Sequence, residues 1–203
     1  MRGYLMRHKT ILYDGILADA YFNDPYVWFS PYLWSFCHAK QARIEVGMKI
    51  LWLSKVDGMY CCDLVFVVGE ILPLEAARAL YTSNDADLEA YHFRQGLEAH
   101  PDMELTFVAD MKHSYIPHPA VPLEAEVNTA LKRQRSEAKP LDVVWRRPSV
   151  PLRVEAIDEL EQIVAERAQQ RITGRLPKTS QRVIKLKCPK GQKQLEEANR
   201  DGI

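Results

Sequence analysis

The chain has 203 residues, of which 47 % are hydrophobic and 27 % are charged, as in ordinary soluble proteins with one sizeable core. It contains no apolar run of the roughly 18 residues that a membrane-spanning helix needs, and its first residues lack the apolar stretch of a signal peptide. These features exclude a membrane-spanning segment and lead us to expect a cytoplasmic protein.

The formal net charge is zero, but the charges are unevenly distributed. Residues 1–131 contain 10 Lys and Arg against 17 Asp and Glu, whereas residues 132–193 contain 16 against 7. The C-terminal third is therefore strongly basic. Two interpretations stay open: this third forms a surface that attracts a polyanion, or it pairs with the acidic first part of the same chain.

The cysteines predict buried free thiols. They form no CxxC pair, and two of them are adjacent in a predicted strand, so their side chains point to opposite faces of the sheet. We therefore expect neither a shared metal nor a disulfide, because free cysteine is among the most buried residue types. The four are Cys37, Cys61, Cys62 and Cys188.

The amino-terminal part combines a strand with an aromatic segment. Ile11–Tyr13 is predicted as a strand that ends in a turn at Asp14-Gly15. The residues from Tyr21 to Phe36 include eight aromatic side chains, and prolines break this segment into turns and extended pieces. Such rings either plug one end of a small barrel or offer a surface on which a base stacks.

A β-hairpin is predicted at the centre of the fold. Its strands are Lys49–Ser54 and Met59–Ile71, and Asp57-Gly58 between them is a strong turn signal. Both strands are apolar on both faces, so we expect the hairpin to be covered on both sides. Gly69 indicates a bulge or a close backbone approach near the end of the second strand.

Asp63 lies inside the second strand of this hairpin, between apolar neighbours. A buried carboxylate must be hydrogen-bonded or paired. We expect Asp63 to brace a loop through backbone amides, and a catalytic role is the alternative.

The remaining elements follow from helical spacing, capping signals and alternation. Helices are predicted at Leu74–Tyr81, Ala86–His92, Leu123–Glu137 and Leu152–Gln170, the last with Pro151 in its first turn. The apolar face of the third helix consists of Leu123, Val127, Ala130 and Leu131. Further strands are predicted at Glu104–Val108, Leu141–Trp145 and Val183–Leu186.

These elements predict an α+β fold, with a small mixed or antiparallel barrel-like sheet, inserted helices and a long C-terminal helix. We expect residues 1–149 to form a barrel-like core domain with a helical insertion. Residues 150–203 are expected to form a C-terminal helix and a basic tail packed on that core.

The loop from Asp110 to His118 is the most enzyme-like segment. A carboxylate with the imidazoles of His113 and His118 can hold a metal or supply a general base, which makes a metal-dependent hydrolase or nuclease, with Asp63 as a further residue, an alternative function. The spacing matches no established ligand pattern, and the chain has no P-loop and no GxGxxG motif. We therefore expect no catalytic residues, no metal and no cofactor.

Three segments resemble the PUA-like superfamily, in particular its EVE and ASCH branches and the nucleotide-modification-associated domains. They are Ser35-Phe36-Cys37, Val46–Leu53 and Cys62–Ile71, which together with the residues between them span about forty residues. Met48 stands where the family commonly has Asp. The resemblance implies a compact barrel with flanking helices that reads a modified or flipped base in RNA or DNA.

A nucleic-acid-binding module is the leading functional prediction, because aromatic rings can hold an unstacked base while cations hold the backbone. A protein-interaction domain that docks a partner through the helix at Val150–Ile172 is another alternative. The predicted stacking residues are Trp28, Tyr32, Trp34 and Trp52; the predicted phosphate ligands are Arg146, Arg147, Arg175 and Lys178; and His113, Tyr115 and His118 complete the predicted binding site.

Overall fold

The computed structural model describes residues 2–7, 34–36, 43–56, 58–83, 105–141 and 149–173, and all structural findings below refer to these residues. Four predicted elements lie wholly or almost wholly outside them: the strand at Ile11–Tyr13, the helix at Ala86–His92, the strand at Leu141–Trp145 except for its first residue, and the edge strand at Val183–Leu186.

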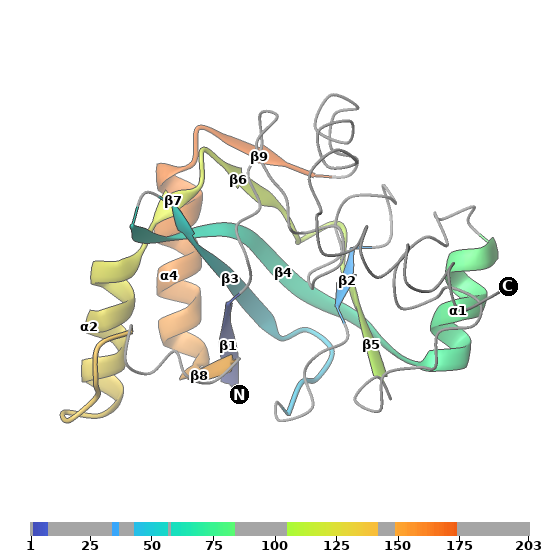
Figure 1. Cartoon of the computed structure of the whole chain (residues 1–203), viewed down its shortest axis with the longest axis horizontal. Helices are drawn as coiled ribbons and strands as arrows, with labels where there is room; N and C mark the ends of the chain where they lie inside the picture. Colours follow the sequence, from blue (N-terminus) through green and yellow to red (C-terminus); the bar gives the residue numbers. More distant parts are fainter. Residues whose placement is uncertain are drawn as a thin grey trace, which may run out of the picture.

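In this part of the chain, seven strands form one mixed sheet, and two more form a separate ribbon (Figure 1). The sheet has the order β2-β5-β4-β3-β1-β8, with β7 paired to β4, and only β1 and β3 run parallel. The strands are β1 (Arg2–Arg7), β2 (Ser35–Phe36), β3 (Lys49–Val56), β4 (Met59–Pro73), β5 (Leu105–Ala109), β7 (Val121–Pro122) and β8 (Ser149–Arg153), and the ribbon consists of β6 (Ile116–His118) and β9 (Gln170–Ile172).

The sheet and its helices confirm the predicted α+β class. The described strands form an open path, with β2 at one end and β8 at the other. Closure of this sheet into a barrel therefore remains a prediction.

The central hairpin forms as predicted. Val56 of β3 pairs with Met59 of β4, on either side of the predicted turn residues. Gly58 has a φ of 85°, a conformation that glycine adopts without steric cost. The predicted bulge at Gly69 is also confirmed, because the pairing of β4 with β5 shifts between Val68 and Glu70.

The sheet buries a different cluster of side chains on each face, which explains why its central strands are apolar on both faces. One cluster combines strand residues such as Leu51 and Val65 with the apolar faces of two helices. The opposite cluster is rich in aromatic residues and draws its members from strands and loops, with none from a described helix. We call it the aromatic cluster; its rings are Tyr4, Trp34, Phe36, Trp52, Phe66 and Phe107.

Three helices are described: α1 (Leu74–Ser83), α2 (Glu124–Gln134) and α4 (Val154–Arg167). Helices α2 and α4 lie side by side at one end of the molecule, and α1 lies at the other end (Figure 1). The predicted apolar face of α2 is buried, as are Leu123 before it and three α4 residues, Ile157, Leu160 and Val164. No described helix is long and apolar enough to cross a membrane.

The start of the last helix differs from the prediction. Residues 149–153 form strand β8, and α4 begins only at Val154 and ends at Arg167. Pro151 therefore lies in an edge strand instead of in the first helical turn. An edge strand tolerates proline at a position whose missing N–H would have faced away from the sheet, and Pro151 stands opposite Tyr4 of β1.

The outer edge of β8 is covered by a side chain of α2. The Gln134 amide accepts a hydrogen bond from the Arg153 backbone N–H at 3.2 Å and donates one to the Pro151 carbonyl at 3.4 Å. Gln134 thus supplies the donor and acceptor that a neighbouring strand would supply, and it links the C-terminal turn of α2 to the sheet.

Candidate functional site

Two of the four predicted stacking residues belong to the interior. Trp34 is 0 % exposed and Trp52 is 3 % exposed, and the rings of Phe36 and Trp52 make a T-shaped contact with 5.3 Å between their centroids. Among the described residues, both indoles are packed against other side chains, so the two rings act first as core residues. Trp28 and Tyr32 lie outside the described residues. A role of these rings in base binding stays a prediction.

Trp34 has one unusual property for a core residue. Its indole Nε1–H is buried and forms no hydrogen bond with a described residue. Most buried donors in native proteins are satisfied, and an unsatisfied one costs about 1–3 kcal/mol. The aromatic cluster therefore contains a donor that an entering acceptor group would stabilise.

Asp63 is buried, with 2 % exposure, and is held by a hydroxyl group. It is the extra residue in a register shift, because Trp52 pairs with Leu64 whereas Leu53 pairs with Cys62. The Ser54 hydroxyl donates to Asp63 Oδ2 at 2.6 Å. A side-chain hydroxyl on the paired strand thus contacts the carboxylate, and the bracing of a loop through backbone amides stays a prediction.

The two described cysteines are buried free thiols, as predicted. Burial raises the pKa of the Cys62 thiol well above its ordinary value, and the nearby charge of Asp63 adds to this effect. Cys62 therefore stays protonated and unreactive at neutral pH. Cys37 and Cys188 lie outside the described residues.

The loop that suggested a metal centre does not assemble one. Asp110 Oδ2 lies 2.6 Å from His113 Nδ1, and its other oxygen accepts the Lys112 backbone N–H at 2.9 Å. His118 instead lies in β6, where it stands opposite Gln170. No three histidine, cysteine, aspartate or glutamate side chains of the described residues could hold a metal together. The metal-dependent hydrolase or nuclease is therefore not supported.

The Asp110–His113 contact should make the stability of the folded state depend on pH. The hydrogen bond with His113 is the main cause that lowers the pKa of the Asp110 carboxyl, and the bond from the Lys112 backbone N–H adds to it. A lowered pKa stabilises the folded state at pH values above the ordinary pKa of about 3.9, and this contribution is lost as the pH falls through the lowered pKa.

Asp110→Asn is accordingly expected to reduce the free energy of unfolding at pH 7 by less than about 1 kcal/mol, because the pair is largely exposed. Urea denaturation at pH 7 and pH 3 measures the effect, and the difference from the wild type should shrink at pH 3. A difference of the same size at both pH values would contradict this assignment.

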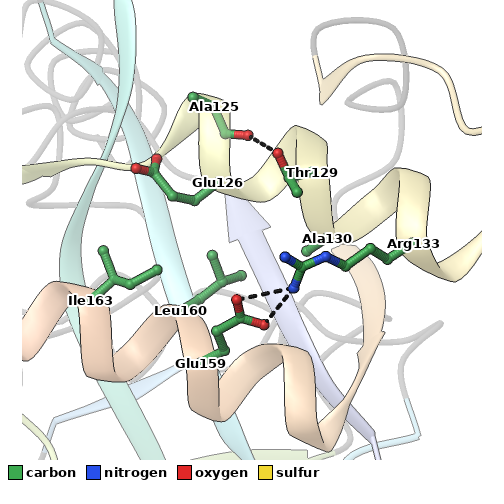
Figure 2. A pocket seen from close by; sticks show the side chains of 8 residues that line it. All are labelled: Ala125, Glu126, Thr129, Ala130, Arg133, Glu159, Leu160 and Ile163. Carbon is green, nitrogen blue, oxygen red and sulfur yellow. Dashed lines mark hydrogen bonds and ion pairs between the residues drawn. The ribbon is translucent and has the colours of Figure 1, made fainter.

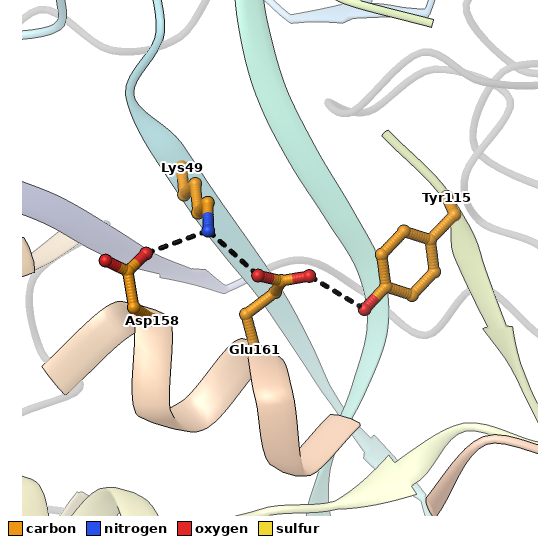
Figure 3. Close-up of polar contacts among 4 residues, drawn as sticks. All are labelled: Lys49, Tyr115, Asp158 and Glu161. Carbon is orange, nitrogen blue, oxygen red and sulfur yellow. Dashed lines mark hydrogen bonds and ion pairs between the residues drawn. The ribbon is translucent and has the colours of Figure 1, made fainter. Parts of the chain in front are cut away.

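A chain of polar contacts fastens α4 to the sheet and to the segment before β6 (Figure 3). Lys49 of β3 donates to Asp158 and to Glu161 of α4, each at 2.8 Å, and the Tyr115 hydroxyl donates to the other oxygen of Glu161 at 3.4 Å. Burial lowers the pKa of Lys49, but both carboxylates outweigh this effect and the pKa lies above its ordinary value. Burial and the charge of Glu161 raise the pKa of Tyr115.

The ribbon joins two of the segments that were predicted to take part in binding. Strand β9 runs antiparallel to β6, so that Arg171 stands opposite Pro117. The Arg171 guanidinium lies 5.2 Å from the centre of the Tyr115 ring. Tyr115 and His118 are thereby placed next to the last described residues of the basic C-terminal third, whereas His113 contacts Asp110 in the turn before them. Arg175 and Lys178 follow these residues in the sequence but lie outside the described part.

The described cations of the C-terminal third, apart from Arg171 in the ribbon, fall into two groups. Where α2 and α4 face each other, carboxylates neutralise them: Arg133 binds Glu159 at 2.9 Å, and Arg167 binds Glu126. A second group is exposed and forms no ion pair within the described residues. We call this group the corner cations: Lys132, Arg135, Lys139 and Arg153.

The corner cations lie at the end of α2, in the segment that follows it and in β8. Lys132 and Arg135 lie at the C-terminal end of α2, and Lys139 lies two residues before Leu141, whose backbone N–H donates to Asn128 of α2. The Gln134 side chain bonds to the backbone of β8 and so brings Arg153 to the same corner. Arg146 and Arg147 lie between these segments in the sequence and outside the described residues. Neither Arg135 nor Arg153 was among the predicted phosphate ligands, although the uneven charge distribution was a signal for both.

A groove of about 230 Å³ runs between α2 and α4 (Figure 2). Its floor is apolar, with Ala130, Leu160 and Ile163, and the Arg133–Glu159 pair bridges its rim. The guanidinium that faces it is thus already neutralised, so this groove is a poor site for an anionic ligand.

Comparisons with known proteins identify no family. No family model and no curated protein matches the sequence. Among solved structures, the chain is similar to the human THYN1 protein in complex with 5-methylcytosine-containing DNA, at 14 % identity and a TM-score of 0.36, over 81 % of this chain and 98 % of that chain. A similarity of this extent shows neither the family nor the fold of the chain.

Proposed function

We propose that this protein is a nucleic-acid-binding module and that the corner cations contact the phosphates of the nucleic acid. The observation that carries the proposal is their lack of neutralising carboxylates within the described residues, in contrast to Arg133 and Arg167. If every cation of the basic third were paired with a carboxylate, the charges would support only the packing of this third against the rest of the chain. Exposed cations that form no ion pair with a described carboxylate provide a surface that attracts a polyanion.

The corner can contact several phosphates at once. Its four side chains are long and exposed, and they extend from the end of α2, from the segment after it and from β8. Gln134 links the end of α2 to β8. Each phosphate that a cation neutralises releases condensed counterions. Log K therefore falls more steeply with log salt, by about 0.9 per phosphate for duplex DNA and about 0.7 for single strands.

The test is the salt dependence of binding to a labelled duplex, measured by fluorescence anisotropy from 50 to 300 mM salt. We expect affinity to fall as salt rises. A four-residue corner variant should weaken binding to every sequence and make the salt dependence shallower by about one slope unit for each phosphate that is no longer bound. Its substitutions are Lys132→Gln, Arg135→Gln, Lys139→Gln and Arg153→Gln.

The matched control is the double variant Arg133→Gln and Arg167→Gln, which removes cations that already have carboxylate partners. It should change the slope far less per charge removed. Absence of binding in the wild type, or equal effects of the two variants per charge, would refute the proposal.

A finer part of the proposal is that the sheet closes into a PUA-like barrel and that an unpaired or modified base enters the aromatic cluster. The buried N–H of Trp34 supports it, because a base offers carbonyl and ring-nitrogen acceptors to a donor that has no acceptor among the described residues. Neighbouring rings would stack on the base.

Trp34→Phe is expected to remove this donor while it retains an aromatic ring. The measurement compares a duplex that carries one unpaired base with the same duplex carrying an abasic site. The wild type should prefer the base, whereas the variant should lose most of this preference and keep its affinity for the abasic duplex. If the wild type shows no preference for the base, the base-binding part of the proposal is refuted, whereas the phosphate-binding part still stands.

A further inference from the structure

We infer that the ribbon of β6 and β9 carries a second phosphate-binding surface, separate from the corner, so that one protein molecule holds two nucleic-acid segments. This inference rests on the proposed function and concerns the number and placement of its binding surfaces. Its central residue is Arg171 of β9, and the other cation that we assign to it is Lys112, an exposed residue of the turn that precedes Tyr115 and β6. We call the two residues the ribbon cations.

The structure holds Arg171 in place from two sides. Its guanidinium lies over the Tyr115 ring at 5.2 Å, and its Nη2 donates to the Ala165 carbonyl at 3.3 Å. Tyr115 is itself fixed by its bond to Glu161. Arg171 remains exposed and forms no ion pair with a described carboxylate. A guanidinium that is positioned but not neutralised loses less conformational entropy when it binds a phosphate.

The turn before β6 supplies the second cation. Lys112 is exposed, and its backbone N–H donates to Asp110, whose carboxylate also contacts His113. Asp110, with His113 against it, is thus one acidic neighbour of this surface, and Glu161, which accepts the Tyr115 hydroxyl and is paired with Lys49, is another. The Lys112 side chain has no carboxylate partner in the described part of the chain.

Helix α4 separates the two surfaces. It begins directly after β8, at the corner, and it ends three residues before β9, at the ribbon. Figure 1 shows β8 and the ribbon at opposite ends of this helix. Its 14 residues span about 20 Å. This distance exceeds two Debye lengths of about 8 Å each at physiological ionic strength, so the surfaces act independently.

The exposed side of α4 is acidic, which prevents one backbone from joining the two surfaces along the helix. Phosphates that crossed it would approach the carboxylates of Glu155 and Glu166, which form no ion pair with a described cation, whereas Asp158 and Glu159 are paired with Lys49 and Arg133. A segment at the corner and a segment at the ribbon are therefore different segments. The exposed acidic residues of the helix are Glu155, Asp158, Glu159 and Glu166.

Sedimentation velocity of the full chain with a 12-base-pair duplex tests the inference, because it gives the number of duplexes per protein molecule. We expect two duplexes for the wild type and one for the ribbon variant Lys112→Gln and Arg171→Gln. The four-residue corner variant should also bind one, and the combined variant none. Arg171→Lys, which keeps the charge, should retain two and so separates the removal of a phosphate ligand from a loosened ribbon.

A ratio of one duplex per molecule in the wild type, or a ribbon variant that still binds two, would overturn the inference. If a single duplex binds and the corner variant abolishes it, the second surface is refuted and the proposed function stands. If no duplex binds at all, the proposed function itself fails.

Discussion

Replacing Gly69 with alanine is expected to lower the free energy of unfolding by about 1–3 kcal/mol, the usual cost of forcing an extra methyl group into a packed site. A β-carbon at this position would lie 2.8 Å from the Asp110 backbone nitrogen and 3.0 Å from its α-carbon. Both atoms belong to the backbone, so no side-chain rotation can relieve the overlap. The strand or the turn at Asp110 has to move.

That movement would break hydrogen bonds that anchor the turn. The Asp110 backbone N–H donates to the Val67 carbonyl at 2.7 Å, and the buried Ser114 hydroxyl accepts the Val67 N–H at 2.9 Å. Equilibrium urea denaturation measures the destabilisation, with Glu70→Ala as the control because it changes the next, exposed residue of the same bulge. A Gly69→Ala protein within about 0.5 kcal/mol of the wild type would show that the bulge is not tightly packed.

Phe66→Ala is expected to cost more, about 3–5 kcal/mol. Phe66 is fully buried in β4, and its ring meets Phe36 edge to face with 5.1 Å between centroids. Phe36 in turn stacks on Phe107 at 4.8 Å. Truncation leaves a cavity in the middle of the aromatic cluster, and this destabilisation is a large share of the roughly 5–15 kcal/mol that stabilises a typical domain.

Thermal and urea denaturation of Phe66→Ala should therefore both show a strong shift. Phe66→Leu keeps most of the volume and is expected to lose much less, which separates cavity formation from loss of the ring. Val46→Ala is the surface control, because Val46 is 63 % exposed and its change should stay within about 0.5 kcal/mol. An alanine variant as stable as the leucine variant would mean that the cluster collapses around the vacancy.

Local signals predicted the parts of the fold that depend on neighbouring residues. The hairpin follows from a two-residue turn between apolar runs, and the buried face of α2 follows from helical spacing. Gly69 was recognisable as a bulge because a glycine inside an apolar strand has few other uses. In each case the residues that decide the structure lie within a few positions of one another.

Features that depend on distant pairing were missed. Strand β1 is stabilised by parallel pairing with β3 and by antiparallel pairing with β8, both far away in the sequence, and its own residues show no clear alternation. Pro151 is compatible with a helix start as well, and only the pairing of β8 with β1 decides between the two. Ribbon strand β9 has only three residues, too few for a periodic pattern.

In the candidate site, too, the features that depend on distant parts of the chain could not be predicted from the sequence. A dense run of aromatic residues does not reveal which rings face the core, because burial of Trp34 and Trp52 depends on strands that are distant in the chain. The basic character of the C-terminal third was evident from composition, but composition does not show which cations meet a carboxylate. Only the packing of α2 on α4 separates Arg133 from Arg135, which has no carboxylate partner among the described residues.

The amide of Gln134 has a consequence for self-association. An unprotected terminal strand exposes N–H and C=O groups that template the addition of strands from other molecules, which is a common start of aggregation. Here one glutamine occupies the Pro151 carbonyl and the Arg153 N–H, and the proline contributes no donor of its own. Among the described strands, the sheet thus ends at β8, where a side chain takes the place of a further strand and opposes fibril-like growth from this edge.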